Sequence, residues 1–296
     1  MRVLVTGATG MLGRDLVATL KTAVDVTACD RATLDITDAA ALPDAVAGHD
    51  VVVNTAAWTD VDGAEAREAE ATAVNGHAVA GLARACATTG ARLLHISTDY
   101  VFAGTGVTPY PEDAPTAPVN AYGRGKLIGE RAVLATLPTT GYVVRTAWLY
   151  GAHGRNFVDT MRRLAAAQET VEVVVDQRGQ PTWTVALAEQ LAALAAAAVR
   201  GDAPPGVYHG TATGEATWHD LAQAVFAALG LDPQRVHPTT SDRFPRPARR
   251  PAYSVLGHDR WRAAGLPLQP HWRDQLATYL ATRTGSATSV PSRADG

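Results

Sequence analysis

The feature that most constrains this chain is a glycine-rich turn directly after its first apolar segment. Residues 2–6 (RVLVT) form a short run rich in β-branched side chains, and Gly7, Gly10 and Gly13 follow it. Leucine and valine then recur at helical spacing as far as Leu20. A strand, a glycine turn and a helix in this order bind the pyrophosphate of a dinucleotide, because glycine lets the backbone approach the phosphates. The spacing is G-x-x-G-x-x-G and not G-x-G-x-x-G, which leaves a glycine turn without a ligand as an alternative.

The remainder of the first 150 residues alternates between short apolar runs and helical patterns. Further strands are expected at residues 25–29, 50–54, 91–96 and 142–146, and helices at 38–46, at 68–89 and from Tyr122 onward. This alternation predicts an α/β fold with a Rossmann-type, doubly wound parallel sheet over residues 1–150. A smaller C-terminal α/β substrate-binding part is expected over 151–284, interleaved with the first. The small, polar residues 285–296 are expected to form a disordered tail.

Composition narrows the function classes. A formal net charge of −3 gives no electrostatic footprint for nucleic acid. The two cysteines lie in unrelated contexts and the nine histidines are scattered, so we predict neither a disulfide framework nor a metal site. The first strand starts almost at Met1, and the apolar run at 187–199 is too short to cross a bilayer. We therefore expect a cytoplasmic protein without a membrane partner.

The loops after the second and third strands carry candidate cofactor contacts. Asp30 is placed for the ribose hydroxyls of NADH, whereas Arg31 could hold the 2′-phosphate of NADPH, so both cofactors remain open. Small residues after the third strand let a ribose or flat ring pass, although close packing explains them equally well. The cofactor-binding residues predicted from these loops and the glycine turn are Gly7, Thr9, Gly10, Met11, Leu12, Gly13, Asp30, Arg31, Asp35, Ile36, Ala56 and Ala57.

A second chemical feature lies between residues 97 and 126. Tyr122 and Lys126 are four residues apart, so in a helix they share one face, and the ammonium is expected to lower the tyrosine pKa. Ser97 and Thr98 end the apolar run at 91–96, at the sheet edge where ligands bind. A hydroxyl, a tyrosine and a lysine are what ketone reduction needs. The alternative is an exposed tyrosine and lysine with no role.

The residues resemble a known family. The glycine pattern and the Tyr122/Lys126 pair look like an extended short-chain dehydrogenase/reductase. Further stretches are similar to the dTDP-4-dehydrorhamnose reductase family, in matching order over nearly the whole chain: STDYVF (97–102), NAYGRGKLIGE (120–130), RTAWLY (145–150), NF (156–157), DQRGQPT (176–182), TW (217–218) and ARRPAYSVL (248–256).

The resemblance implies NADPH- or NADH-dependent reduction of the 4-keto group of a dTDP-4-keto-6-deoxy-L-hexose, which gives dTDP-L-rhamnose in the family's usual reaction. Tyr122 would protonate the oxygen, Lys126 would lower the tyrosine pKa and hold the nicotinamide ribose, and Thr98 would hydrogen-bond the substrate oxygen. Both Tyr122 and Lys126 would therefore contact the cofactor. The implied partner is the dTDP-sugar, and a homodimer is expected. The substrate-binding residues implied are Thr59, Val61, Thr98, Asp99, Tyr100, Trp148, Asn156, Gln180 and Arg250.

Three other functions remain open from the sequence. Trp58 departs from the family pattern and could reshape the sugar pocket, which favours a 4-ketoreductase for a related dTDP-deoxysugar. A sugar-nucleotide epimerase with tightly bound NAD would share the fold and the Y-x-x-x-K pair. A non-catalytic regulatory subunit is the third, although such a subunit could lose the tyrosine and the lysine. The acidic cluster that binds a divalent ion in some relatives is not recognised, so no metal is predicted.

Overall fold

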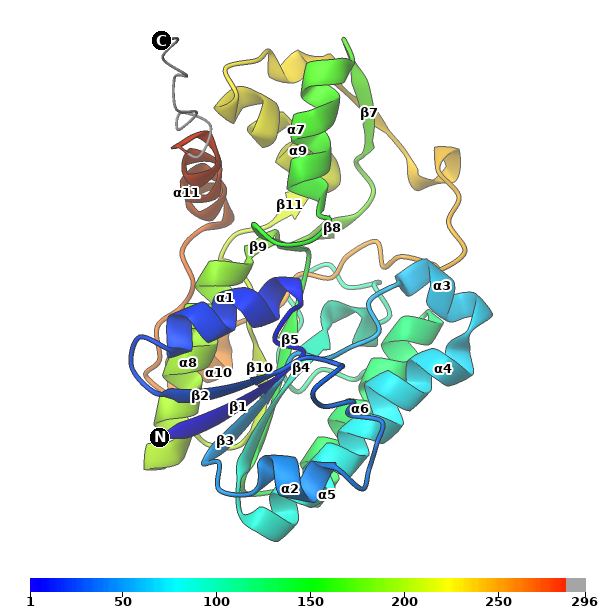
Figure 1. Cartoon of the computed structure of the whole chain (residues 1–296). Coiled ribbons are helices and arrows are strands. Elements are labelled where there is room, and N and C mark those ends of the chain that lie inside the picture. The colour runs from blue at the N-terminus through cyan, green and yellow to red at the C-terminus, as the bar shows by residue number, and fades with distance from the viewer. Residues whose placement is uncertain (286–296) are drawn as a thin grey trace, which may run out of the picture.

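A six-stranded parallel sheet organises the first lobe of the molecule in the computed structural model, which describes residues 1–285 (Figure 1). Its strand order is β10-β5-β4-β3-β1-β2. The strands are β1 (Arg2–Thr6), β2 (Asp25–Cys29), β3 (Val51–Asn54), β4 (Arg92–Thr98), β5 (Gly141–Thr146) and β10 (Gly206–His209). The chain reverses its direction across the sheet between β1 and β3, which opens a crevice at the carboxyl ends of the strands. The predicted Rossmann-type fold is confirmed.

Helices cover both faces of this sheet because successive strand residues alternate between them. Val3 and Val5 pack toward α1 (Met11–Leu20) and α8 (Thr184–Arg200). Leu4 packs on the opposite face with α2 (Leu42–Val46), α5 (Val79–Thr89) and α6 (Ala121–Thr136). Figure 1 shows the two layers on either side of the strands. Both α8 and β10 come from beyond residue 150, yet they complete this first lobe.

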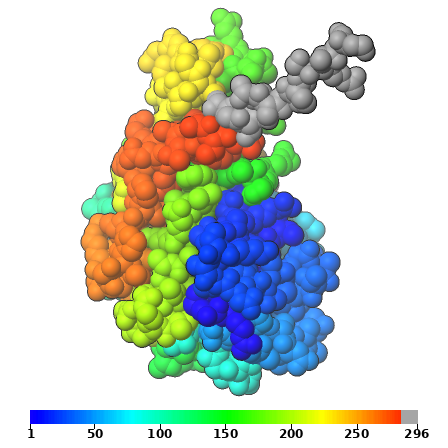
Figure 2. All heavy atoms as spheres, turned by 60° about the vertical axis from the view of Figure 1, so that its left-hand side comes forward, coloured from blue at the N-terminus to red at the C-terminus, as the bar shows by residue number. Residues whose placement is uncertain are grey.

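A second, smaller lobe has its own apolar core. The helices α7 (Phe157–Ala167), α9 (Trp218–Ala228) and α11 (Trp272–Gly285) pack around the parallel pair β7 (Val171–Val174) and β12 (Val236–Thr239). Short strand pairs join the lobes: β6 (Leu149–Tyr150) with β9 (Thr182–Trp183), and β8 (Arg178–Gly179) with β11 (Ala216–Thr217). The short α10 (Asp259–Ala263) returns to β10. The space-filling view in Figure 2 shows the yellow and red second lobe above the blue first strands and helices.

Two helices differ from the expectation. The helix expected at 68–89 is divided into α4 (Glu68–Thr72), a π-helix (Ala73–Ala78) and α5, and a short α3 (Val61–Ala66) precedes it. Within the π-helix, the Asn75 side chain accepts a hydrogen bond from the Trp58 backbone N–H and donates one to its carbonyl. The helix expected at 38–46 begins only at Leu42, because the Asp38 carboxylate accepts a bond from the Ala40 N–H and closes a turn instead.

Gly285 ends α11, and the remainder of the expected tail at 285–296 lies outside the described residues. No helix within residues 1–285 combines the length and the apolar character needed to cross a membrane.

Candidate active site

The glycine turn forms the floor of a cavity of about 690 Å³ at the carboxyl edge of the sheet. Gly7 has φ +69°, and a Cβ there would lie 2.6 Å from the Ala56 backbone nitrogen. A Cβ on Gly13 would collide with the Gly7 carbonyl oxygen. Glycine is therefore required for β1, α1 and the third loop to approach one another. No side chain caps the N-terminus of α1, so its amides are available for an anion.

The predicted cofactor residues of the glycine turn gather at one end of this cavity. Gly7, Thr9, Gly10, Met11, Leu12 and Gly13 all line it, together with Ala56 and Ala57 from the loop after β3. This glycine cradle and the uncapped helix N-terminus fit the pyrophosphate of a nicotinamide dinucleotide.

The loop after β2 places its charged residues differently. Arg31, Asp35 and Ile36 line the cavity, and Leu34, which the sequence did not single out, lines it with them. Asp30 does not line it, because its carboxylate closes the turn by accepting bonds from two backbone N–H groups and the Thr33 hydroxyl. These bonds hold the Asp30 pKa below its usual value. The Arg31 side chain is 87 % exposed, and within residues 1–285 its ion pair is with Asp35, at 3.3 Å.

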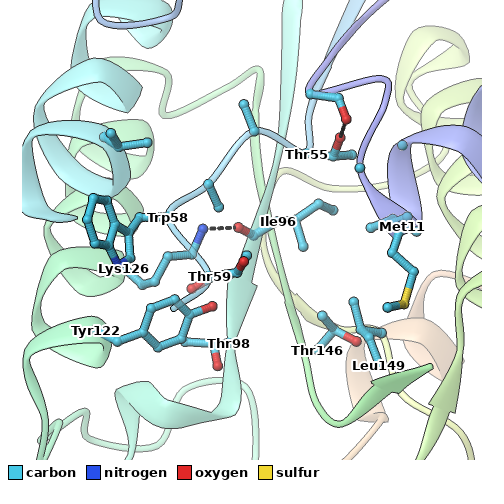
Figure 3. Close-up of a pocket in the computed structure, with 18 of the residues that line it drawn as sticks. Met11, Thr55, Trp58, Thr59, Ile96, Thr98, Tyr122, Lys126, Thr146 and Leu149 are labelled. Carbon is cyan, nitrogen blue, oxygen red and sulfur yellow. Dashed lines mark hydrogen bonds between the residues drawn. The ribbon is translucent and has the colours of Figure 1, made fainter. Parts of the chain in front are cut away.

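The candidate catalytic side chains meet at the ends of β4 and α6. Asn120 begins α6 by accepting a bond from the Gly123 N–H at 2.8 Å, which places Tyr122 in the first turn. Lys126 is one turn further on, and its Nζ donates to the Ile96 carbonyl oxygen at 2.6 Å. Figure 3 shows Tyr122, Lys126 and Trp58 on one side of the cavity and Met11 and Leu149 on the other.

The two hydroxyls that end β4 have separate tasks. Ser97 donates to the buried carboxylate of Glu130 at 2.5 Å, which also holds Arg145 in an ion pair. Thr98 donates to the Asp99 carboxylate at 3.0 Å. The same hydroxyl lies beside Tyr122, and a hydrogen bond from Thr98 to the phenol oxygen lowers the Tyr122 pKa. Ser97 and Thr98 both line the cavity, but the Ser97 proton is engaged by the buried Glu130.

The net shift of the Tyr122 pKa is opposite to the one expected from the nearby Lys126. Burial and the neighbouring Asp99 carboxylate raise the Tyr122 pKa, and the hydrogen bond with Thr98 opposes this only in part. Burial lowers the Lys126 pKa to about 8, against the attraction of Glu130. The sequence showed the spacing of the pair but not how deeply both groups are buried. Tyr122 is therefore a neutral phenol, which is the species able to give a proton.

The Asp99 carboxylate is buried beside this group. Burial raises its pKa to about 6, while hydrogen bonds from Ser254 and Thr98 favour the ionised form. The Ser254 hydroxyl, from a loop more than 150 residues further along the chain, donates to Asp99 at 2.5 Å. The loop 248–256 therefore supports the catalytic end of the cavity from the distant part of the sequence.

The predicted sugar-side residues divide into two groups. Thr59, Val61, Asp99, Tyr100 and Trp148 line the cavity. Trp218 and Arg155 line it as well, although the sequence analysis assigned neither to the site and named Trp218 only within a stretch similar to the family. Trp58 was noted only as a departure from the family pattern. The tryptophan next to the helix-capping Thr217 was the available signal for Trp218.

The second group does not line the cavity. The Asn156 side chain caps α7. Gln180 is buried, and its amide bonds to the backbone of Ala212 and Leu256. Arg250 forms an ion pair with Asp62 at 2.5 Å. Their polar groups are occupied within the protein, so the structure gives these three a supporting position and not a place in the cavity wall.

No metal-binding cluster of three or more His, Cys, Asp or Glu side chains occurs among the 285 residues that the structure describes.

Comparison with known proteins agrees with this geometry. The chain is 57 % identical over 289 residues to a dTDP-4-dehydrorhamnose reductase from Streptomyces griseus, covering 97 % of this chain and 95 % of the relative. It is 54 % identical to a dTDP-4-keto-6-deoxy-D-glucose reductase from Streptomyces niveus, covering 93 % and 95 %. A crystal structure of dTDP-4-dehydrorhamnose reductase from Bacillus anthracis in complex with NADP superposes with a TM-score of 0.89 at 34 % identity, covering 95 % and 99 %. Residues 1–284 match the family described as RmlD substrate binding domain, and the chain belongs to that family.

Proposed function

We propose that the protein reduces the 4-keto group of a dTDP-4-keto-6-deoxy-L-hexose with NADPH or NADH, and that its principal product is dTDP-L-rhamnose. The observation that carries this proposal is the meeting of three features in one cavity: the glycine cradle at α1, the Tyr122–Thr98 pair, and Lys126. The relative from Streptomyces griseus is named a dTDP-4-dehydrorhamnose reductase, and its match covers 97 % of this chain. This likeness supports a dTDP-sugar as the substrate.

Three residues beside the glycine cradle have separate roles in the proposed reaction. When bound on the glycine cradle, NADPH or NADH supplies the hydride that reduces the carbonyl carbon. Tyr122, kept neutral by burial, gives its proton to the oxygen that gains negative charge. Thr98 lies beside the phenol, and by donating to its oxygen it favours the phenolate that the proton transfer leaves. The Lys126 ammonium, close to the same strand end, stabilises the phenolate that forms.

A second candidate is a 4-ketoreductase for a related dTDP-deoxysugar. It is favoured by the 54 % identical relative named for dTDP-4-keto-6-deoxy-D-glucose and by the three tryptophans, Trp58, Trp148 and Trp218, around the cavity. Bulky rings in the wall of a pocket discriminate between sugars by shape.

One experiment separates these functions. Purified protein is mixed with dTDP-4-keto-6-deoxy-L-mannose or with dTDP-4-keto-6-deoxy-D-glucose, and the nicotinamide absorbance is followed once with NADPH and once with NADH. We expect loss of one reduced nicotinamide for each L-sugar consumed. A higher kcat/KM for the D-sugar would select the second candidate. Turnover without consumption of added cofactor would instead indicate an epimerase, and no turnover of either sugar would contradict the proposal.

The homodimer and the cytoplasmic location stay predictions from the sequence, and light scattering of the purified protein tests the first.

A further inference from the structure

The backbone of Trp148 adopts an unusual conformation at the edge of the cavity. Trp148 lies two residues beyond Thr146, which is paired with Thr98 in the register of β5 and β4. Its φ is +48°, and within residues 1–285 no other residue except glycine has a positive φ. A bulky residue keeps such a conformation only where its surroundings determine it, and these positions concentrate at ligand sites.

Two contacts determine where the Trp148 indole lies. It stacks on Trp218, with the ring centroids 3.6 Å apart and the planes 6° from parallel. Gly179 packs against the same indole so closely that a Cβ on this glycine would lie 2.7 Å from Cε2, 2.8 Å from Nε1 and 2.9 Å from Cζ2. The three nearest atoms to such a Cβ all belong to Trp148, so the absence of a side chain at position 179 makes room for that ring.

The second lobe fixes both of these supports. Trp218 is the first residue of α9, whose start is held by a capping box between Thr217 and Asp220. Its indole N–H donates to the Gln177 side chain at 3.1 Å, and Phe157 packs against it with a centroid distance of 4.6 Å. Gly179 belongs to β8, which pairs with β11 immediately before α9.

We infer that Gly179 and Trp218 are positioning residues which clamp the Trp148 indole in the cavity wall, so that the second lobe sets the shape of the sugar pocket. Gly179 does not line the cavity and acts through Trp148, whereas Trp218 also forms part of the wall. The inference rests on the proposed function, because it takes the sugar of a dTDP-sugar as the group that this wall selects. It assigns a task to the glycine of the DQRGQPT segment.

The test uses Gly179→Ala, Trp218→Ala and Trp218→Phe in the full chain, with Trp183→Ala as the matched control. Trp183 is a partly buried tryptophan of the same apolar cluster, and it does not line the cavity. We expect Gly179→Ala and Trp218→Ala to raise KM for the dTDP-sugar about tenfold while KM for NADPH stays within about twofold. Trp218→Phe keeps a stacking ring and should recover most of the affinity. Trp183→Ala should lower the melting temperature without changing KM for the sugar.

A purely structural role would give a different result. If Gly179→Ala and Trp218→Ala fold with wild-type KM values for the sugar, or if KM for NADPH rises equally, the clamp is refuted. The near-ultraviolet circular dichroism of each variant reports separately on the environment of the tryptophans. If the wild type reduces neither sugar, the proposed function fails, while a Gly179→Ala spectrum identical to that of the wild type would refute the clamp itself.

Discussion

The two ends of the cavity are built in different ways. The end at which we propose that the cofactor binds is lined mainly by consecutive residues, from Gly7 to Gly13, and it presents mostly backbone. The end at which we propose that the sugar binds is lined by side chains from segments far apart, such as Trp58, Trp148 and Trp218. A backbone cradle binds the pyrophosphate, which all dinucleotides share. Large side chains from several segments can instead be substituted one at a time, and each substitution changes the shape of the pocket. Within one fold, the cofactor can therefore stay constant while the sugar changes.

The largest effect is expected where the two ends meet, at Tyr122. Tyr122→Phe removes the proton donor and should lower kcat by about 10²–10⁴-fold, with the Kd for NADPH nearly unchanged. Steady-state kinetics and a fluorescence titration measure the two quantities. The matched control is Tyr208→Phe, which removes a buried hydroxyl that donates to the Pro204 carbonyl and lies outside the cavity. If Tyr122→Phe kept the wild-type kcat, Tyr122 would not be the proton donor.

The backbone character of the cofactor end is tested by Gly7→Ala. The methyl group meets the Ala56 nitrogen at a positive φ, so we expect the Kd for NADPH to rise about 100-fold. Gly90→Ala is the matched control, because Gly90 has φ +78° but nothing within 4 Å of an added Cβ. That control should lose about 1 kcal/mol of stability and bind NADPH normally. Equal losses of NADPH affinity in both variants would mean that strain, and not the cradle, decides binding.

The charge on Lys126 predicts that kcat depends on pH. Burial lowers the Lys126 pKa to about 8, so the ammonium is lost as pH rises through that value. Because the ammonium stabilises the phenolate that forms at Tyr122, kcat should fall about tenfold by pH 9. Lys126→Arg keeps its charge and should move this fall to higher pH, even if its plateau is lower. An unchanged descending limb in Lys126→Arg would assign the titration to another group.

The smallest expected effect lies at the outer edge of the cofactor end. Arg31→Ala should raise KM for NADPH about fivefold and leave KM for NADH unchanged, because the exposed guanidinium can pair with a 2′-phosphate while Asp30 is occupied by its own turn. NADH serves as the internal control in the same preparation. A larger rise in the KM for NADH than in the KM for NADPH would contradict the assignment of Arg31 to the 2′-phosphate.

The sequence predicted the glycine turn and the elements on either side of it because this information is local. Strand, glycine turn and helix lie within 20 consecutive residues, and Gly7 is explained by its own φ. The Tyr122/Lys126 pair was found through helical spacing for the same reason. The raised Tyr122 pKa was not predictable from spacing, because it depends on burial and on the Asp99 carboxylate, which lies directly after β4 and not in the helix of Tyr122.

The sugar end was predicted only in part because its information is long-range. Trp148 came from the family resemblance, but Trp218 contacts it across about 70 positions of sequence, and no spacing rule links them. Gln180 and Arg250 belong to recognisable segments, yet their side chains bond within the protein. A motif shows that a residue matters without showing whether it touches the ligand or supports a neighbour.

The most direct test of the central claim, proton donation by Tyr122 during hydride reduction of a sugar ketone, follows isotope from cofactor to sugar. The protein is supplied with deuterium-labelled NADPH and dTDP-4-keto-6-deoxy-L-mannose, and the product is examined by NMR for the wild type and for Tyr122→Phe. We predict one deuterium at carbon 4 for each NADPH oxidised by the wild type, and almost no product from Tyr122→Phe. Deuterium absent from carbon 4, or equal product from the two proteins, would contradict it.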